Sequence, residues 1–270
     1  MTAPDLPVSV TPLAAILQRG RWRLRDLHAD PNPALYVFTR GQGRVFVDGK
    51  TRGLTGPCYL YIPARATTRF AFPVQVFGTK LSFTPEIAEA LPQTALLLRN
   101  PTGAVQADLA WMLARIEAEG RSGTEDASDA ISACGRLLAL EIARLHRQDG
   151  APLWATSKSE RLVAEFMGLI EADLAERPSN QPSVAGYAER LGITPTHLTR
   201  VCQSVAGTGA SALLQDRVLS EARWRLADTP NPVHQIADAL GYGSAAYFAR
   251  SYGARMGQPP SADRLALRRG

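Results

Sequence analysis

The sequence predicts an α+β fold, in which an antiparallel β-barrel with flanking helices precedes an all-helical region. Three observations predict it. Short β-rich runs separated by turn residues fill residues 22–83, apolar residues recur at helical spacing from residue 105, and a helical pattern repeats with a period of about 50 in the last third. The 270 residues are enough for two cores, so we expect domains at residues 1–150 and 160–270, joined by a linker at 151–159.

The barrel is predicted from runs rich in β-branched and aromatic residues. These runs are residues 35–38, 45–47, 59–62 and 74–83. Gly41, Gln42 and Gly43 separate the first two runs, and Asp48-Gly49 marks another tight turn. Many short strands with close turns predict a small antiparallel barrel or sandwich.

Two amphipathic helices follow the strands. The first has an apolar stripe made of Val105, Leu109, Met112, Leu113 and Ile116. The second, at residues 128–146, has one made of Ile131, Cys134, Leu138, Ile142 and Leu145. Leu137 and Leu140 widen this second surface, so it can serve a second subunit as well as the barrel. Burial in the core alone is the alternative.

The repeated pattern in the last third consists of two pairs of helices. The first copy has Val184, Tyr187, Ala188 and Leu191 before Gly192, and the second has Val233, Ile236, Ala237 and Leu240 before Gly241. Each glycine can end a helix in the left-handed conformation. Thr194 and Ser244 are the expected N-caps of the two following helices. A short helix, a glycine turn and a newly capped helix form the pattern of a helix-turn-helix unit.

The second helix of each unit leaves a set of residues facing outward. We expect DNA contacts from Thr196, His197, Thr199, Arg200, Gln203, Ser244, Ala246, Tyr247 and Arg250. Arg200 and Arg250 occupy equivalent places, and an exposed arginine can donate two hydrogen bonds to guanine in the major groove. The alternative is that each is a solvated surface arginine. Matched positions in a repeated unit favour DNA contact.

A connecting helix is expected at residues 211–227, with Leu214, Val218 and Ala222 on its buried face and Glu221–Arg225 as a supporting ion pair. About 17 residues make a helix of roughly 25 Å. Such a spacer can hold two recognition helices about one duplex turn apart, in successive major grooves.

Charge and cysteine usage limit the function classes. Net charge is +5, and from Arg190 onward ten arginines stand against five acidic residues. This suits a polyanion partner, although an arginine-rich solvated surface explains it equally well. Cys58, Cys134 and Cys202 are odd in number and far apart, which fits a reducing cytoplasm better than a disulfide framework. We expect neither a secretory signal nor a membrane span.

Residues 183–264 resemble the DNA-binding domain of the AraC/XylS family of transcriptional regulators. The resemblance rests on Ile236-Ala237, Leu240-Gly241-Tyr242, residues 247–252 and residues 257–261. Where the family usually has Phe-Lys, this chain has Tyr252-Gly253. The second unit is therefore expected to contribute more to phosphate positioning and shape readout. Residues 187–200 look closest to regulators of aromatic-acid catabolism, of the 4-hydroxybenzoate hydroxylase activator type.

Residues 20–85 resemble the family's cupin-like sensor barrel. The resemblance implies a small organic effector, and Arg40, Arg44 and Lys80 lie in or beside predicted strands, where a cation can face inward and pair with a carboxylate. Exposure of all three to solvent is the alternative. No His-x-His pair is present in the strand region, so we expect no metal, no cofactor and no catalytic residue.

The sequence therefore predicts a cytoplasmic, non-enzymatic transcription regulator that binds double-stranded DNA as a homodimer. An aromatic acid is one candidate effector, and RNA polymerase is a further partner if the protein is an activator. Two alternatives stay open. One is a ligand-independent architectural DNA-binding protein, and the other is a metal-free cupin enzyme fused to a DNA-binding module.

Overall fold

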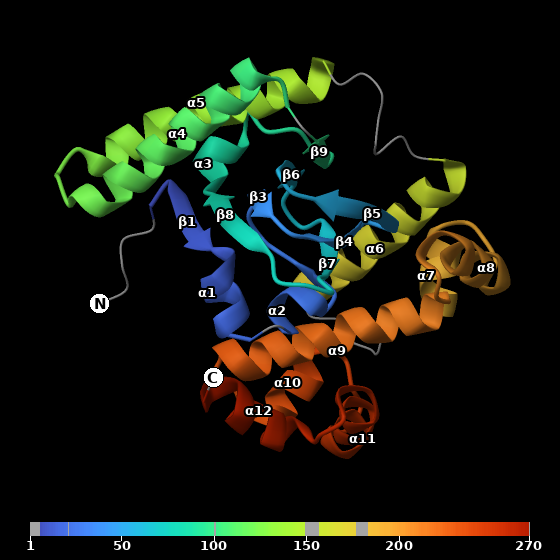
Figure 1. Cartoon of the computed structure of the whole chain (residues 1–270). Helices are drawn as coiled ribbons and strands as arrows, with labels where there is room; N and C mark the ends of the chain where they lie inside the picture. The colour runs from blue at the N-terminus through green and yellow to red at the C-terminus, as the bar shows by residue number, and fades with distance from the viewer. Residues whose placement is uncertain (1–5, 21, 100, 149–156, 177–182, 270) are drawn as a thin grey trace.

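The computed structural model describes residues 6–20, 22–99, 101–148, 157–176 and 183–269. It confirms the α+β class, with a β-rich N-terminal part and a helical C-terminal part (Figure 1). Within these residues two antiparallel sheets have the strand orders β1-β8-β3-β6-β9 and β2-β7-β4-β5. The strands are β1 (Val8–Pro12), β2 (His28–Ala29), β3 (Ala34–Arg40), β4 (Gln42–Val47), β5 (Lys50–Thr55), β6 (Cys58–Ile62), β7 (Thr67–Ala71), β8 (Phe77–Phe83) and β9 (Leu96–Arg99).

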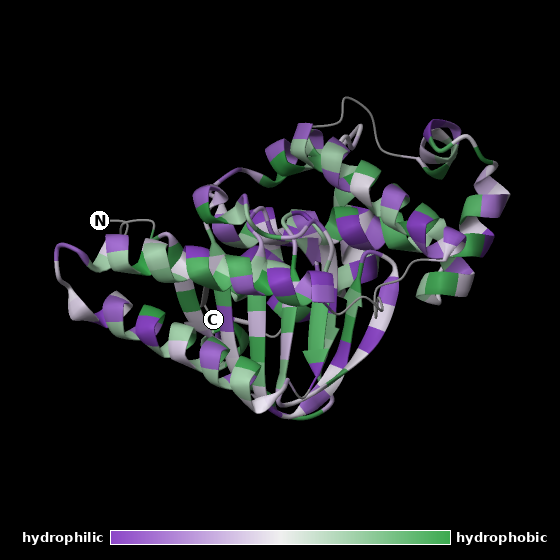
Figure 2. Ribbon diagram, turned by 90° about the horizontal axis from the view of Figure 1, so that it is seen from above, coloured by the Kyte–Doolittle hydropathy of each residue, from purple (hydrophilic) through white to green (hydrophobic). Residues whose placement is uncertain are grey.

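Helices surround the sheets and form the whole C-terminal part. In the N-terminal part they are α1 (Leu13–Gln18), α2 (Trp22–Arg25), α3 (Pro85–Ala88), α4 (Gly103–Ser122) and α5 (Ala127–Gln148). In the C-terminal part they are α6 (Lys158–Glu176), α7 (Val184–Arg190), α8 (Pro195–Ala206), α9 (Ala210–Asp228), α10 (Val233–Ala239), α11 (Ala245–Met256) and α12 (Pro260–Arg269). Figure 2 shows apolar residues along the central strands, whereas the helices around them mix apolar and hydrophilic positions.

The alternation of side chains along the strands divides the apolar residues between separate cores. Tyr36 and Phe38 of β3 point between the two sheets and pack with Val45 and Phe70. Leu35 and its neighbours on the opposite face pack against α3, α4 and α5. Because side chains alternate faces along a strand, one sheet serves both cores.

Two turns in the barrel contain residues with positive φ angles. Gly41 has φ of 110° and leads the chain from the first sheet into the second, so the runs on either side of it are not a hairpin. Asp48 and Gly49, with φ of 44° and 91°, join β4 and β5 in a two-residue hairpin turn. The predicted tight turn at Asp48-Gly49 is confirmed, and its two left-handed residues match the twist of the strands.

The predicted helix pair after the strands is confirmed as α4 and α5. Leu109, Met112 and Ile116 are buried on α4, as the stripe predicts. On α5 the core takes Ile131, Leu138, Ile142 and Leu145, whereas Cys134 is half-buried and Leu137 and Leu140 are exposed.

The predicted linker at 151–159 and the predicted loop at 177–182 fall mostly or wholly outside the described residues. The described chain resumes at Ser157, and α6 begins at Lys158, just before the expected start of the C-terminal domain. The predicted connecting helix at 211–227 is confirmed as α9, which is one residue longer at each end.

A buried ion pair within the helical part accepts a hydrogen bond from the barrel. The Glu171 carboxylate on α6 accepts hydrogen bonds from Arg217 Nε on α9 at 2.5 Å and from Thr67 Oγ1 on β7 at 3.1 Å. Arg217 and Glu171 are only 3% and 9% exposed. Burial alone would lower the pKa of Arg217, but Glu171 and Glu221 raise it. The pair fixes α6 against α9, because either buried charge alone would be strongly destabilising, and Thr67 attaches the barrel to it.

An aromatic contact strengthens the same junction. The rings of Trp22 on α2 and Trp224 on α9 lie 5.2 Å apart, edge to face. The Arg23 guanidinium lies against both rings and donates to Asp228 at 2.7 Å and 3.2 Å. Leu27 and Phe46 of the barrel are themselves part of the C-terminal core. The barrel and the C-terminal helices are therefore packed as one unit.

We expect Gly49→Ala to destabilise the protein by about 1–2 kcal/mol or more, since a left-handed non-glycine residue is unfavourable. An added Cβ would also lie 2.6 Å from Val163 Cγ1 of α6, so the junction would have to repack. Urea unfolding measures the change. Gly53→Ala is the matched control, because a Cβ there meets no atom within 4 Å. Equal stability of the two variants would contradict the hairpin contact.

Asp48 makes stability depend on pH. Burial raises the pKa of Asp48 to about 7, the amide hydrogen bond from Thr67 lowers it, and the Glu171 charge raises it. A folded pKa above the unfolded one gives stability that is present at low pH and lost as pH rises through about 7. Asn accepts the same hydrogen bond and suits the left-handed turn.

We therefore expect Asp48→Asn to gain stability over the natural chain by about 1–3 kcal/mol between about pH 5 and about pH 8. Urea unfolding across this range tests it, with Asp108→Asn at an exposed position of α4 as the control. A stability difference that stays constant with pH would show that Asp48 is not the responsible group.

Candidate nucleic-acid interface

The first helix-turn-helix unit is built from α7 and α8. Ser183 Oγ accepts a hydrogen bond from Gly186 N at 3.2 Å and so caps α7. Gly192 has φ of 66° in the turn. Thr194 Oγ1 accepts from His197 N at 3.2 Å, with Pro195 in the first turn of α8. The predicted Thr194 cap is confirmed, and it leaves the first turn of α8 open to solvent.

The second unit repeats this geometry in α10 and α11. Gly241, with φ of 77°, makes the turn. Ser244 Oγ accepts from Tyr247 N at 3.2 Å, as predicted. Phe248 and Tyr252 are buried where Leu198 and Cys202 are buried in the first unit. The two units therefore present equivalent helix faces from equivalent caps.

The residues expected to contact DNA lie on these two faces. Those exposed to solvent are Thr196, Thr199, Arg200, Gln203, Ser244, Ala246, Tyr247 and Arg250. His197 is half-buried, and its Nδ1 accepts a hydrogen bond from Arg200 at 3.1 Å. Gln203 Nε2 donates to the Gly207 carbonyl at the end of α8, so this side chain is already engaged. Arg200 is the exposed arginine of α8.

Buried polar groups, which the sequence patterns did not indicate, hold the second unit in place. Asp263 of α12 is 1% exposed and accepts hydrogen bonds from Tyr252 Oη at 2.5 Å and Gln258 Nε2 at 2.7 Å. Arg223 Nε of α9 lies 3.1 Å from the same carboxylate, and Arg223 also donates to Asp26 of the barrel at 3.0 Å. These contacts connect α11, α12, α9 and the barrel.

The three cations expected at an effector site do not meet. Arg40 is exposed and lies over the Phe77 ring at 5.0 Å. Lys80 faces the space between the sheets beside Tyr36, but it pairs with the chain's own Asp30 at 2.6 Å. Arg44 lies on the outer face of the second sheet and lines a pocket. Strand periodicity alone did not reveal which face each residue occupies.

The space between the sheets is occupied by aromatic side chains. Tyr36 and Phe70 have ring centroids 4.9 Å apart, and Phe38 and Phe72 are 5.8 Å apart. Across the described ranges, His, Cys, Asp and Glu side chains form no group of three that could hold a metal ion. In the same ranges, no helix is both long and apolar enough to span a membrane.

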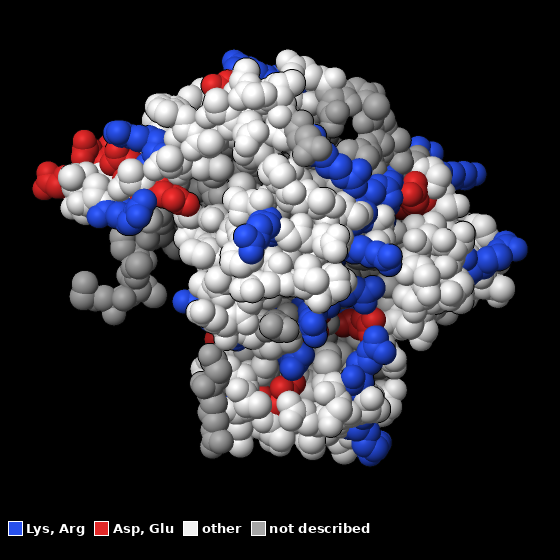
Figure 3. Space-filling model, in the orientation of Figure 1, with Lys and Arg blue, Asp and Glu red and all other residues white. Residues whose placement is uncertain are grey.

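Basic side chains gather on one face of the molecule. Figure 3 shows a band of Lys and Arg that runs from the barrel toward the C-terminal helices. Paired helix-turn-helix units joined by a helix and docked on an antiparallel barrel define a two-domain nucleic-acid-binding class of protein.

Comparison with known families agrees with this class. A family model described as an AraC-like ligand binding domain matches residues 11–134, and one described as a helix-turn-helix domain matches residues 187–266. The chain belongs to the AraC family of transcriptional regulators.

Individual relatives match over part of their length. The transcriptional regulator CdhR of Pseudomonas aeruginosa is 36% identical over 125 residues, which are 45% of this chain and 36% of that protein. A probable bifunctional transcriptional activator/DNA repair enzyme AlkA of Mycobacterium tuberculosis is 32% identical over 99 residues, 37% of this chain and 19% of that protein. The chain thus matches about a third or less of the length of these curated relatives.

Solved structures are similar over the whole chain or the C-terminal part. ToxT of Vibrio cholerae O395 aligns with 98% of this chain and 99% of its own, with a TM-score of 0.49 and 10% identity. An AraC-type regulator from Chromobacterium violaceum covers 42% of this chain and 96% of its own, with a TM-score of 0.36 and 25% identity.

We expect Arg200→Ala to weaken binding to a cognate site by about 1–3 kcal/mol and to relax specificity at one base position, since Arg200 is exposed beside the capped end of α8. Arg250→Ala, at the equivalent place, is expected to weaken cognate and random DNA alike and to lower the salt slope by about 1. Fluorescence anisotropy on both DNAs at several salt concentrations measures this. Unchanged binding by Arg200→Ala would remove its proposed role.

Proposed function

We propose that the chain is a sequence-specific DNA-binding transcription regulator that uses both helix-turn-helix units and is controlled by a small organic effector. One observation carries the proposal. The two units have caps of the same geometry, Thr194 and Ser244, each accepting at 3.2 Å, and each exposes an arginine at the same place, Arg200 and Arg250. Solvent exposure alone would not require arginines at equivalent positions of the two units.

The connecting helix suits two adjacent half-sites. The 19 residues of α9 extend roughly 28 Å at about 1.5 Å per residue. Together with the width of the flanking helices, this length is compatible with two recognition helices about one duplex turn apart. Thr196, His197 and Thr199 are the neighbours of Arg200 that we propose to contact bases. Ser244, Ala246 and Tyr247 are proposed to position the second unit on phosphates.

Selection from a pool of random DNA tests this proposal directly. Full-length protein is expected to enrich two short sequence elements with centres about one helical turn apart. Arg200→Ala would alter the selection at one element, whereas Arg250→Ala would weaken binding without changing the selected bases. Recovery of no enriched sequence, with folded protein, would favour the architectural alternative.

We propose a binding role and no catalytic one. The cysteine site of a repair enzyme would need clustered thiols, whereas Cys58 and Cys202 are buried in different cores and Cys134 is half-buried on α5. Burial raises the pKa of Cys202 to about 11, which disfavours the reactive thiolate.

The proposed partners are double-stranded DNA, an organic acid such as an aromatic acid and, if transcription is activated, RNA polymerase. The resemblance to activators of the 4-hydroxybenzoate hydroxylase type suggests the aromatic acid. A regulator of this kind would act in the cytoplasm.

We also propose domain limits of 1–150 and 160–270, which agree with the start of α6.

We propose a homodimer through the outer face of α4 and α5. Trp111, Leu137 and Leu140 are 60%, 44% and 46% exposed, an unusual amount for large apolar side chains on two packed helices. Leu138 and Leu145 of α5 lie in the core and do not belong to this face.

Leu137→Glu combined with Leu140→Glu is expected to convert a dimer into monomers, because two charges would be buried at the interface. Analytical ultracentrifugation measures the state, and circular dichroism checks the fold. Arg144→Glu on the same helix is the charge-changing control. A natural chain that is monomeric at tens of micromolar would refute the homodimer.

A further inference from the structure

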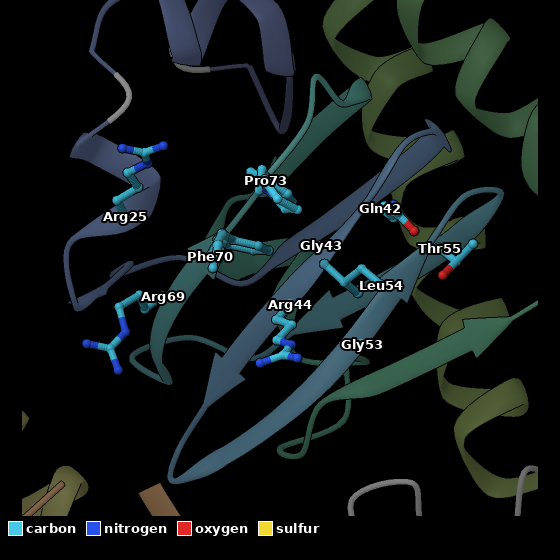
Figure 4. A pocket seen from close by; sticks show the side chains of 12 residues that line it. Arg25, Gln42, Gly43, Arg44, Gly53, Leu54, Thr55, Arg69, Phe70 and Pro73 are labelled. Carbon is cyan, nitrogen blue, oxygen red and sulfur yellow. The ribbon is translucent and has the colours of Figure 1, made fainter. Parts of the chain in front are cut away.

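A cavity of about 760 Å³ lies over the outer face of the second sheet (Figure 4). The pairing register of β4 and β7 shows which face of the sheet the cavity lies on. Arg69 is opposite Phe46, and Arg44 is two residues before Phe46 on β4, so all three side chains share one face. Phe46 is covered by the C-terminal core. The cavity therefore begins where the C-terminal helices stop covering the sheet.

Three arginines line this cavity. Arg44 and Arg69 line it from β4 and β7, and Arg25 of α2 lies at its edge with its guanidinium turned away from the other two (Figure 4). Arg44 stands between Gly53 and Ala71 on the neighbouring strands, so small residues leave its guanidinium accessible. None of the twelve residues that line the cavity in the described chain is acidic, although Arg69 is paired with Asp216 of α9 on another side. No acid of the lining balances Arg25 and Arg44, so an anion would be stabilised there.

The wall of the cavity also offers apolar and neutral polar contacts. Phe72 and Pro73 lie at one side, where the Phe72 ring also packs with Phe38 and Phe70 at the edge of the inter-sheet core. Both residues also border a second hollow, which residues of α1 and α2 line. Gln42 and Thr55 pair across β4 and β5 at the other side. An apolar surface with a few convergent polar groups is typical of sites for small organic molecules.

One of the three arginines connects the cavity to the second helix-turn-helix unit. Arg69 lies 3.6 Å from the Asp216 carboxylate on α9. Asp216 is mostly buried and also pairs with Arg255 of α11. A ligand anion beside Arg69 would compete with Asp216 for this guanidinium. The Arg69–Asp216 and Arg255–Asp216 ion pairs, which share one carboxylate, thus connect the cavity to α11.

We propose that this outer cavity, rather than the space between the sheets, binds the effector as an organic carboxylate. Its carboxylate lies between Arg44 and Arg69, with Arg25 adding positive charge at the edge, and its apolar part lies on Phe72 and Pro73. Binding weakens the Arg69–Asp216 contact and so changes how α9 and α11 are held against the barrel. The inference rests on the proposed function, because it assigns the site and the regulation of the same effector.

Calorimetric titration of the full chain with benzoate, octanoate and phenyl phosphate tests the site. At least one carboxylate is expected to bind, and Arg44→Ala should weaken it about tenfold or more, the equivalent of about 1.4 kcal/mol. Arg40→Ala removes the same charge outside the cavity and should leave affinity unchanged. Equal losses in both variants, or binding by phenyl phosphate alone, would overturn the carboxylate site.

DNA titration with and without the bound carboxylate tests the coupling. A ligand alters DNA affinity only by binding the DNA-competent and incompetent states differently, and about fivefold or more is expected. Asp216→Asn should keep carboxylate binding and abolish this change, and Arg255→Gln, at an exposed position, should do the same. A change in DNA affinity that survives both substitutions would overturn the proposed route.

The two proposals fail separately. If no carboxylate binds at millimolar concentration while the protein still selects a DNA sequence, the cavity assignment is wrong and the DNA-binding function stands. If Arg44→Ala instead weakens ligand-free DNA binding and lowers its salt slope by about 1, Arg44 contacts phosphate and the effector site is overturned.

Discussion

The buried ion pair of Glu171 on α6 and Arg217 on α9, to which Thr67 of the barrel donates a hydrogen bond, is the contact on which the relation of the two domains depends. Desolvating two charges is costly, and removal of either partner would leave a buried charge without compensation. The pair therefore fixes α6 against α9. The barrel docks on these helices through Thr67 and through the Arg23–Asp228 and Arg223–Asp26 ion pairs, which cross the junction. The barrel is therefore held against α6 and α9, the same helices that support the recognition units.

From this junction, polar contacts extend to the second helix-turn-helix unit. Asp26 of the barrel bonds Arg223 of α9, Arg223 reaches Asp263 of α12, and Asp263 accepts from Tyr252 of α11. The first unit is joined to α6 by Arg190 of α7, which donates to Asp173 at 2.8 Å and 2.9 Å, and it otherwise rests on apolar packing against α6 and α9. Contacts with the barrel therefore reach both units, through α6 to the first and through α9 and α12 to the second.

Local signals in the sequence predicted much of the fold and part of the site. Thr194 and Ser244 are caps because a hydroxyl beside a glycine turn satisfies nearby amides, and the Asp48-Gly49 turn is likewise decided by neighbouring residues. The face of the sheet on which each strand side chain lies was harder to predict. Lys80 points between the sheets and Arg44 points outward, because the face depends on how each strand pairs with distant segments. The contacts of Glu171 and Asp263 join residues far apart in sequence, and no spacing rule indicates them.

Coincident unfolding of the two domains tests the central claim, that one buried junction unites the barrel with the DNA-binding helices. Replacing Trp111 and Trp154 with Phe leaves Trp22 and Trp224, which face each other across the junction, as the fluorescent probes. The account predicts that their fluorescence and far-ultraviolet circular dichroism follow a single transition in urea. Loss of the tryptophan contact at lower urea, followed by separate unfolding of a folded domain, would contradict it.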